Sequence, residues 1–158
     1  MFKVNVDGAV FSAQKEVGIG VIIRDDEGRV EAALSKKLYT LLGAVEVEVK
    51  AFEAGFLFAK DIGIQEFILE WDSIIVHRAL CDMSTPLASI EPIILVMHAL
   101  FREFHRVGYS HVHRQSNRPS HLLAKHVKCI VYYTAWIEEN LYFLEQALIH
   151  DVLPISHH

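Results

Sequence analysis

Apolar and polar side chains alternate along several short stretches of the chain, and one longer stretch repeats its apolar residues at helical spacing. The alternation in Phe2–Ala9 has the period of a β-strand. Similar patterns predict four further strands, at Gly18–Arg24, Arg29–Tyr39, Glu66–Asp72 and Val107–His113. Between the third and fourth strands, Ala44–Ile62 changes to a helical period, and Gly63 is its expected C-cap.

Helical patterns continue through the second half of the chain. They predict helices at Ser73–Leu80, at Ile90–Phe104, from Pro119 through Tyr133, and at Trp136–Leu153, with a loop at Cys81–Ser89. The resulting order is βββαβαβα. Because a strand–helix–strand crossover makes the fourth strand parallel to a neighbour, we expect an α/β protein with a mixed sheet and helices on its faces.

The length of 158 residues fits one domain with a substantial core. We expect the main domain to span residues 1–135, with residues 136–158 as a helical extension. An apolar content of 52% leaves hydrophobic side chains to spare, which indicates a partner surface. The net charge of −5 does not by itself favour nucleic-acid binding, so such binding would depend on a local basic patch or on metal ions.

The termini, apolar runs and cysteines bear on the compartment. The chain enters a strand at once, with no signal peptide, and the apolar run Ile93–Met97 is too short to span a bilayer. Cys81 and Cys129 are typical of buried thiols in a reducing compartment, with a disulfide between them as the alternative. We therefore expect a soluble intracellular protein, unless a larger precursor has been trimmed.

Asp7 is unusual because it lies within a predicted central strand, on the face opposite Val4 and Val6. A carboxylate buried there is unfavourable by several kcal/mol unless a positive group lies beside it. Asp7 is therefore either a salt-bridged structural acid or one wall of a metal site, and the strand alone supports both interpretations equally.

Glu48 and Asp72 are two further acids in unexpected places. Glu48 lies on the apolar stripe of its helix, where a glutamate more often extends to solvent at the edge. Asp72 ends a strand, where either it or Ser73 could cap a helix. If this strand is parallel to the first, however, Asp7 and Asp72 lie about 5 Å apart. We expect the helix of Glu48 to cross the same face.

Three converging carboxylates would repel one another, and a pKa would rise unless a cation neutralised them. Oxygen ligands of this kind suit Mg²⁺ or Mn²⁺. Two such ions, held roughly 4 Å apart by shared carboxylates, are a recurring arrangement for displacement at phosphorus. Taken together, the three acids thus favour a metal site more strongly than each does alone.

An ordered set of segments covers nearly the whole chain: NVDGA (Asn5–Ala9), GIGVIIRDDEGRV (Gly18–Val30), VEVKAFEAGFLFAKDIGI (Val47–Ile64), ILEWDS (Ile68–Ser73), HVHRQSNRPSHLLAKHV (His111–Val127) and WIEE (Trp136–Glu139). With these segments the chain resembles the ribonuclease H family. More closely, it resembles the plant reverse-transcriptase-like RNase H domains thought to derive from non-LTR retrotransposons.

The resemblance implies an RNase H-like fold, with a five-stranded mixed sheet of order 3-2-1-4-5. It also implies metal-dependent cleavage of the RNA strand of RNA–DNA hybrids, which leaves 5′-phosphate and 3′-hydroxyl ends. Asp7, Glu48 and Asp72 match catalytic carboxylates that hold two ions, Mg²⁺ or Mn²⁺, and Glu48 would also contact a ribose 2′-hydroxyl. His121 stands where the classical family has a fourth carboxylate, and its imidazole suits Mn²⁺ better than Mg²⁺.

The resemblance further implies which residues contact the hybrid. The backbone of Gly8 and Ala9 is expected close to the RNA strand. Polar residues of the bacterial enzymes are replaced here by Ala44 and Val45, and the loop Cys81–Ser89 stands in place of a basic protrusion. We therefore expect weak affinity, with the hybrid held by Arg114, Asn117, Arg118 and Lys125.

Ten histidines also raise the possibility of a zinc site. Those in the relevant region are His111, His113, His121 and His126. Because no cysteine pair or HxxxH spacing supports them, we expect surface roles rather than structural zinc for most of them.

The main alternative is an RNase H-like module that binds nucleic acid or a protein partner without catalysis. Apolar residues of the expected C-terminal helix favour it, namely Trp136, Tyr142, Phe143 and Leu144. Retention of Asp7, Glu48 and Asp72 argues against it, because a domain without catalysis has no need of three unfavourable acids.

Overall fold

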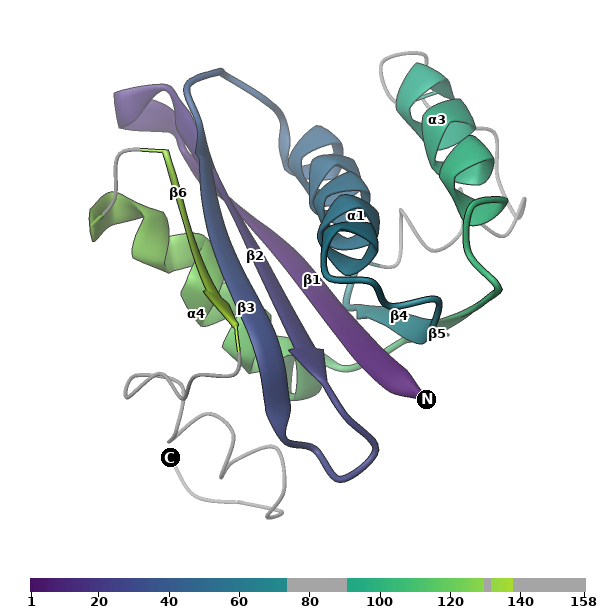
Figure 1. Ribbon diagram of the computed structural model, residues 1–158. Helices are drawn as coiled ribbons and strands as arrows, with labels where there is room; N and C mark the ends of the chain where they lie inside the picture. Colours follow the sequence, from purple (N-terminus) through teal and green to yellow (C-terminus); the bar gives the residue numbers. More distant parts are fainter. Residues whose placement is uncertain (74–90, 130–131, 138–158) are drawn as a thin grey trace.

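A single mixed sheet organises the computed structural model, which describes residues 1–73, 91–129 and 132–137 (Figure 1). Its strands are β1 Phe2–Phe11, β2 Glu16–Arg24, β3 Val30–Leu38, β4 Glu66–Trp71, β5 Arg106–His111 and β6 Tyr133–Ile137. Their order is β5-β4-β1-β2-β3-β6. The first three strands are antiparallel, whereas β4 is parallel to β1 and to β5. The predicted α/β class and the 3-2-1-4-5 order are confirmed.

Helices cover both faces of this sheet. They are α1 Ala44–Asp61, α3 Glu91–Phe101 and α4 Arg118–His126, with 3₁₀ turns at Ser12–Gln14, Arg114–Asn117 and Val127–Cys129. In Figure 1, α1 and α3 lie on one side of the sheet and α4 on the other. The predicted helix Ser73–Leu80 and the loop Cys81–Ser89 lie almost wholly outside the described residues. No helix in the described ranges is both long and apolar enough to cross a membrane.

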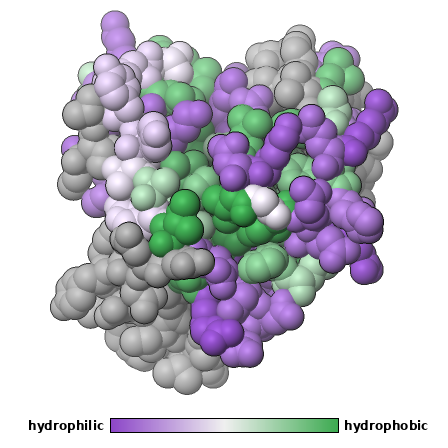
Figure 2. All heavy atoms as spheres, in the orientation of Figure 1, coloured by the Kyte–Doolittle hydropathy of each residue, from purple (hydrophilic) through white to green (hydrophobic). Residues whose placement is uncertain are grey.

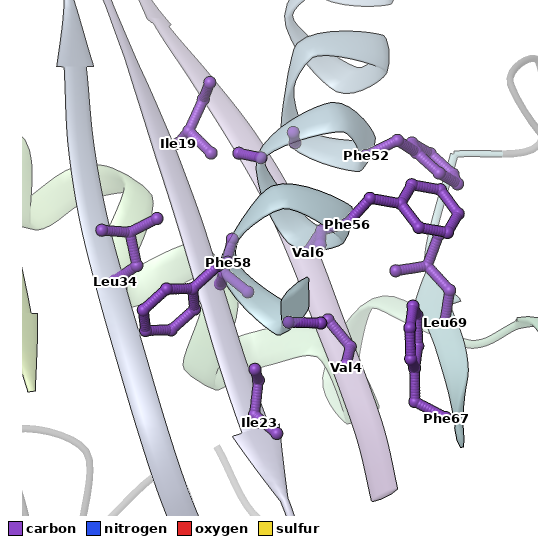
Figure 3. Packing of buried hydrophobic residues seen from close by; sticks show 14 of the residues in the cluster. Val4, Val6, Ile19, Ile23, Leu34, Phe52, Phe56, Phe58, Phe67 and Leu69 are labelled. Atoms are coloured by element: carbon purple, nitrogen blue, oxygen red, sulfur yellow. The ribbon is translucent and has the colours of Figure 1, made fainter. Parts of the chain in front are cut away.

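The main core lies between α1 and the central strands. Figure 3 shows Phe52, Phe56 and Phe58 of α1 among side chains from the strands. A Cβ atom on Gly55 would lie 2.6 Å from the Val6 side chain, so only glycine lets the helix pack this closely on β1. This close approach fixes the depth of the helix that carries Glu48.

On the opposite face, α4 packs directly on the backbone of β2. A Cβ atom on Gly20 would overlap the carbonyl oxygen of Ser120, and one on Gly18 would overlap that of Ala124. Leu123 fills a small second core here with Ile22 and is fully buried. These two glycines therefore bring the beginning of α4 close to the middle of the sheet.

The last described strand corrects the sequence prediction. We expected one helix from Pro119 through Tyr133 and another from Trp136, but α4 ends at His126 and Tyr133–Ile137 forms β6, which pairs with β3. The aromatic and β-branched residues of this segment favour a strand, and β3 offers an edge for pairing. The predicted boundary after residue 135 falls inside β6, and residues 138–158 lie outside the described part of the chain.

An apolar groove of about 370 Å³ lies between α1 and the β3–β6 edge. Figure 2 shows hydrophobic residues gathered at the centre of this face. Its lining includes Leu57 and Phe58 from α1 and Tyr133 and Ile137 from β6. Exposed apolar surface thus occurs where these elements meet, whereas Tyr142, Phe143 and Leu144 lie outside the described residues.

Candidate metal and catalytic site

Two aspartates meet where β4 ends beside the longer β1. The parallel pairing of β1 with β4 stops at Asn5 and Glu70, although β1 continues to Phe11. Two residues further along this register, Asp7 stands level with Asp72, which directly follows β4. Asp7, Glu48 and Asp72 each offer an oxygen atom, and these atoms lie within 4.8 Å of one another. The three acids that the sequence singled out are therefore brought together.

Glu48 reaches this position from the other side of the sheet. Its helix packs on the face of Val4 and Val6, not on that of Asp7, so the expectation of one shared face was wrong. The carboxylates can nevertheless meet, because no β4 residue pairs with β1 beyond Asn5. The backbone N–H of Gly8 donates to Oε1 of Glu48 at 3.2 Å, whereas Oε2 is buried without a hydrogen-bond partner among the described residues.

The cluster is electrostatically unfavourable without a cation. Burial and the charge of Asp7 raise the pKa of Glu48 to about 9. Burial and Asp7 also raise the pKa of Asp72, partly offset by Arg114 and His121. A divalent cation would relieve this repulsion and give the buried Oε2 of Glu48 a partner. The oxygen donors and the orphaned atom therefore fit Mg²⁺ or Mn²⁺.

The raised pKa of Glu48 predicts how stability depends on pH without metal. Folded Glu48 keeps its proton up to about pH 9, whereas the unfolded chain releases it near 4.5. Between these values the unfolding free energy should fall as pH rises, by at most about 1.4 kcal/mol per pH unit from this group. The unfolding free energy, measured by urea unfolding at several pH values, should depend less steeply on pH in Glu48→Gln than in the original protein. An equal pH dependence of the unfolding free energy in the two proteins would mean that Glu48 is ionised in the folded state.

His121 is placed beside the acids by the beginning of α4. Its Nδ1 lies 2.7 Å from Oδ2 of Asp7, within hydrogen-bond distance, and its side chain is 35% exposed. Gly20, the β2 partner of Asp7, leaves room for the Ser120 carbonyl, and this close approach brings the next residue to Asp7. His121, which we predicted as a fourth member of the site, thus contacts the cluster through Asp7.

The residues predicted to contact nucleic acid differ in their exposure. Gly8 and Ala9 are partly exposed beside Asp7, and Arg118 and Lys125 are exposed on α4. Arg114 is 86% exposed, and its Nε lies 3.9 Å from Oδ2 of Asp72. Gly8 and Arg114 therefore lie beside the carboxylates, whereas Arg118 and Lys125 are solvent-facing groups on the helix that carries His121.

Asn117 does not fit its predicted contact with nucleic acid, because it is fully buried. Its Nδ2 donates to the carbonyl of Val6 at 2.8 Å, and its Oδ1 accepts from Asn5 at 3.2 Å. Arg24 in turn donates to Oδ1 of Asn5 at 3.2 Å. The sequence reasoning missed Asn5 and Arg24, although Asn5 precedes Asp7 by two residues on the same strand face.

The other histidines of this region have separate neighbours. The His111 ring lies 3.1 Å from the backbone oxygen of Asp72. The His126 ring packs on Trp136 with a centroid distance of 5.6 Å. His111 therefore borders the acids, whereas His126 packs between α4 and β6.

Solved structures share this arrangement of strands and helices. RNase H1 from the archaeon Halobacterium salinarum superposes with a TM-score of 0.76 at 19% identity, covering 81% of this chain and 97% of that one. The N-terminal RNase H domain of a Mycobacterium tuberculosis protein, solved as a fusion with maltose-binding protein, gives 0.70 at 20% identity and covers 78% and 90%. An RNase H1 isolated from compost by a metagenomic approach, solved in complex with an RNA/DNA hybrid, gives 0.72 at 16% identity and covers 80% and 95%. At these identities the likeness shows the RNase H fold.

A family comparison adds a sequence-level match. No curated protein sequence matches the chain. The model of a family described as reverse transcriptase-like matches residues 5–127, a range that includes Asp7, Glu48, Asp72 and His121. Since this match spans most of the chain and all four clustered side chains, the chain belongs to the reverse transcriptase-like family.

Proposed function

We propose that this protein is a metal-dependent endonuclease that hydrolyses the RNA strand of RNA–DNA hybrids. The convergence of Asp7, Glu48 and Asp72 carries this proposal, because their oxygens lie within 4.8 Å at a position where charge repulsion is unfavourable. A structural neighbour solved with an RNA/DNA hybrid supports the substrate class. The products would carry 5′-phosphate and 3′-hydroxyl ends.

Asp7, Glu48, Asp72 and His121 would hold two divalent ions, Mg²⁺ or Mn²⁺. Such ions supply Lewis-acid activation of water and stabilise negative charge on the departing 3′-oxygen. Asp7 lies within reach of all the other groups, because it clusters with Glu48 and Asp72 and contacts His121. Gly8 holds Glu48 through its N–H, which leaves the second, buried carboxylate oxygen available to an ion.

Recognition of the hybrid would depend on groups around the acids. Glu48 is the candidate for contact with a ribose 2′-hydroxyl, the group that distinguishes RNA from DNA. Arg114, Arg118 and Lys125 are exposed cations suited to phosphates, and the backbone of Gly8 and Ala9 is open to close approach. Because these cations are few, affinity should be modest and should fall only gradually with salt, since the salt dependence scales with the number of phosphates contacted.

The direct test is cleavage of a hybrid with end-labelled RNA, in Mn²⁺ and in Mg²⁺. We expect the RNA strand to be cut in the hybrid, with RNA duplex and DNA duplex left intact. Mn²⁺ should also raise the melting temperature, and Asp72→Asn should weaken this response because it removes a ligand. Absence of cleavage in both ions, with the melting response retained, would exclude catalysis and leave a metal-binding module.

His121 should set the preference between the two ions. A carboxylate at this position adds charge and a hard oxygen ligand, so His121→Asp should raise cleavage in Mg²⁺ relative to Mn²⁺ by about tenfold. His126→Asp is the matched control, since His126 lies on the same helix but packs on Trp136. An unchanged Mg²⁺/Mn²⁺ ratio in His121→Asp would show that His121 is outside the metal site.

A non-catalytic binding module is the second candidate. The apolar groove between α1 and β6 favours it, because such a surface suits a protein partner. The groove is formed by residues other than the clustered acids, so Leu57→Ser should leave hybrid cleavage unchanged if the nuclease proposal is correct. Loss of cleavage in this variant at normal stability would connect the groove to catalysis.

A further inference from the structure

Three buried polar side chains form a continuous hydrogen-bonded chain beneath the candidate site. Arg24 of β2 donates to Asn5 of β1, and Asn5 donates to Asn117, the last residue of the turn before α4. Asn5 and Asn117 are both 0% exposed. Such groups require complete pairing, since an unsatisfied buried amide destabilises the fold. This series of hydrogen bonds therefore specifies one arrangement of the turn Arg114–Asn117 against β1.

Asn117 attaches the turn to the part of β1 that directly precedes Asp7. Its Nδ2 donates to the carbonyl of Val6 at 2.8 Å, while its Oδ1 accepts from Asn5. Its own backbone carbonyl accepts from the hydroxyl of Ser120 at 2.8 Å, which joins the same residue to the first turn of α4. Asn117 thus connects β1 to both sides of the turn–helix junction.

The residues on either side of Asn117 are those that reach the acids. Arg114, three residues earlier, lies 3.9 Å from Asp72. His121, four residues later, lies 2.7 Å from Asp7. Both contacts therefore depend on where the backbone around Asn117 is held relative to β1.

We propose that Asn117 is a positioning residue, which holds His121 and Arg114 against the carboxylates through its bonds to Asn5 and Val6. This role rests on the nuclease function proposed above. It replaces the direct contact with nucleic acid that the sequence predicted for Asn117. Arg24 supports the arrangement by holding Asn5 in the orientation that faces Asn117.

Two variants remove the hydrogen bonds between Asn117 and β1 in different ways. Asn117→Ala removes both side-chain bonds. Asn5→Asp keeps an acceptor for Arg24, and its charge strengthens that contact, but it removes the N–H₂ that faces Asn117. The second variant therefore tests the connection while Arg24 keeps its partner, and it decides the question if Asn117→Ala does not fold.

The first measurement needs no catalysis. In metal-free protein labelled on histidine with ¹⁵N, we expect the Nδ1 signal of His121 to report a hydrogen bond to Asp7, and both variants should move it toward the value of an exposed imidazole. Added Mn²⁺ alone should broaden the His121 ring signals in the original protein and broaden them less in the variants. Unchanged His121 signals in both variants would overturn the proposal, whether or not the protein cleaves hybrids.

The second measurement uses hybrid cleavage. Asn117→Ala should lower the rate tenfold or more, and the loss should be smaller in a His121→Ala background, because the effect passes partly through His121. Full additivity with His121→Ala would contradict this coupling. If the original protein does not cleave hybrids, the nuclease proposal fails, while the NMR measurement still decides the positioning role.

Ser35→Ala is the matched control. The hydroxyl of Ser35 is buried and donates to the carbonyl of Leu123 in α4 at 2.7 Å, so its removal deletes a buried bond to the same helix away from the turn. We expect a lower melting temperature with the His121 signal and the cleavage rate retained. If Ser35→Ala and Asn117→Ala reduce cleavage equally at similar stability, Asn117 has only a structural role.

Discussion

Asp7→Asn should abolish hybrid cleavage while making the metal-free protein more stable. Asp7 belongs to the same cluster as Glu48 and Asp72, and its charge raises the pKa of both. Loss of this ligand removes transition-state stabilisation of about 4 kcal/mol or more, which corresponds to about 10³-fold in rate. Loss of its charge removes repulsion, and the amide oxygen of the new side chain can still accept a hydrogen bond from His121.

The stability gain in Asp7→Asn should be about 1–3 kcal/mol, with a shift of about 2–4 °C in melting temperature for each kcal/mol. Mn²⁺ should no longer stabilise the variant. Glu66→Gln is a matched control, because Glu66 is an exposed acid at the opposite end of β4 from Asp72. It should change neither cleavage nor the Mn²⁺ response. A metal-free Asp7→Asn protein that melts below the original would show that Asp7 acts as a structural acid.

The candidate acids could be found from the sequence because each breaks a local pattern. Asp7 interrupts a strand, and Glu48 lies on an apolar helical stripe. The convergence of Asp7 with Asp72 required only the parallel pairing of β4 with β1, which the crossover rule predicts. What the sequence could not supply is the length of that pairing. It ends at Asn5, and this allows Glu48 to reach Asp7 from the opposite face.

Non-local pairing also explains the two other differences. Asn117 is an ordinary polar residue of a turn in the sequence, and its partner Asn5 lies 112 positions away. Burial of both amides is therefore a property of the folded sheet. Similarly, Tyr133–Ile137 forms a strand because β3 offers an edge for pairing. Helical periodicity in the flanking residues obscured this strand.

Gly20→Ala should destabilise the protein and separate His121 from Asp7. Gly20 pairs with Asp7 across β1 and β2, and an added Cβ would overlap the Ser120 carbonyl and lie 2.6 Å from the Ala124 nitrogen. Because both neighbours are backbone atoms of α4, the overlap cannot be relieved by a rotamer change. The helix must move outward, and we expect a loss of about 3 kcal/mol in unfolding free energy.

The displaced helix should affect catalysis more than metal binding in Gly20→Ala. Asp7, Glu48 and Asp72 lie on β1, α1 and the end of β4, so Mn²⁺ should still raise the melting temperature, whereas cleavage should fall at least tenfold as His121 moves away. Gly108→Ala is the control, since its Cβ would meet only the Ile68 side chain at an ordinary 3.6 Å. It should change stability by less than about 1 kcal/mol. Equal melting temperatures for the two alanine variants would contradict the close packing of α4 on β2. That packing makes the position of His121 depend on Gly20, the glycine opposite Asp7.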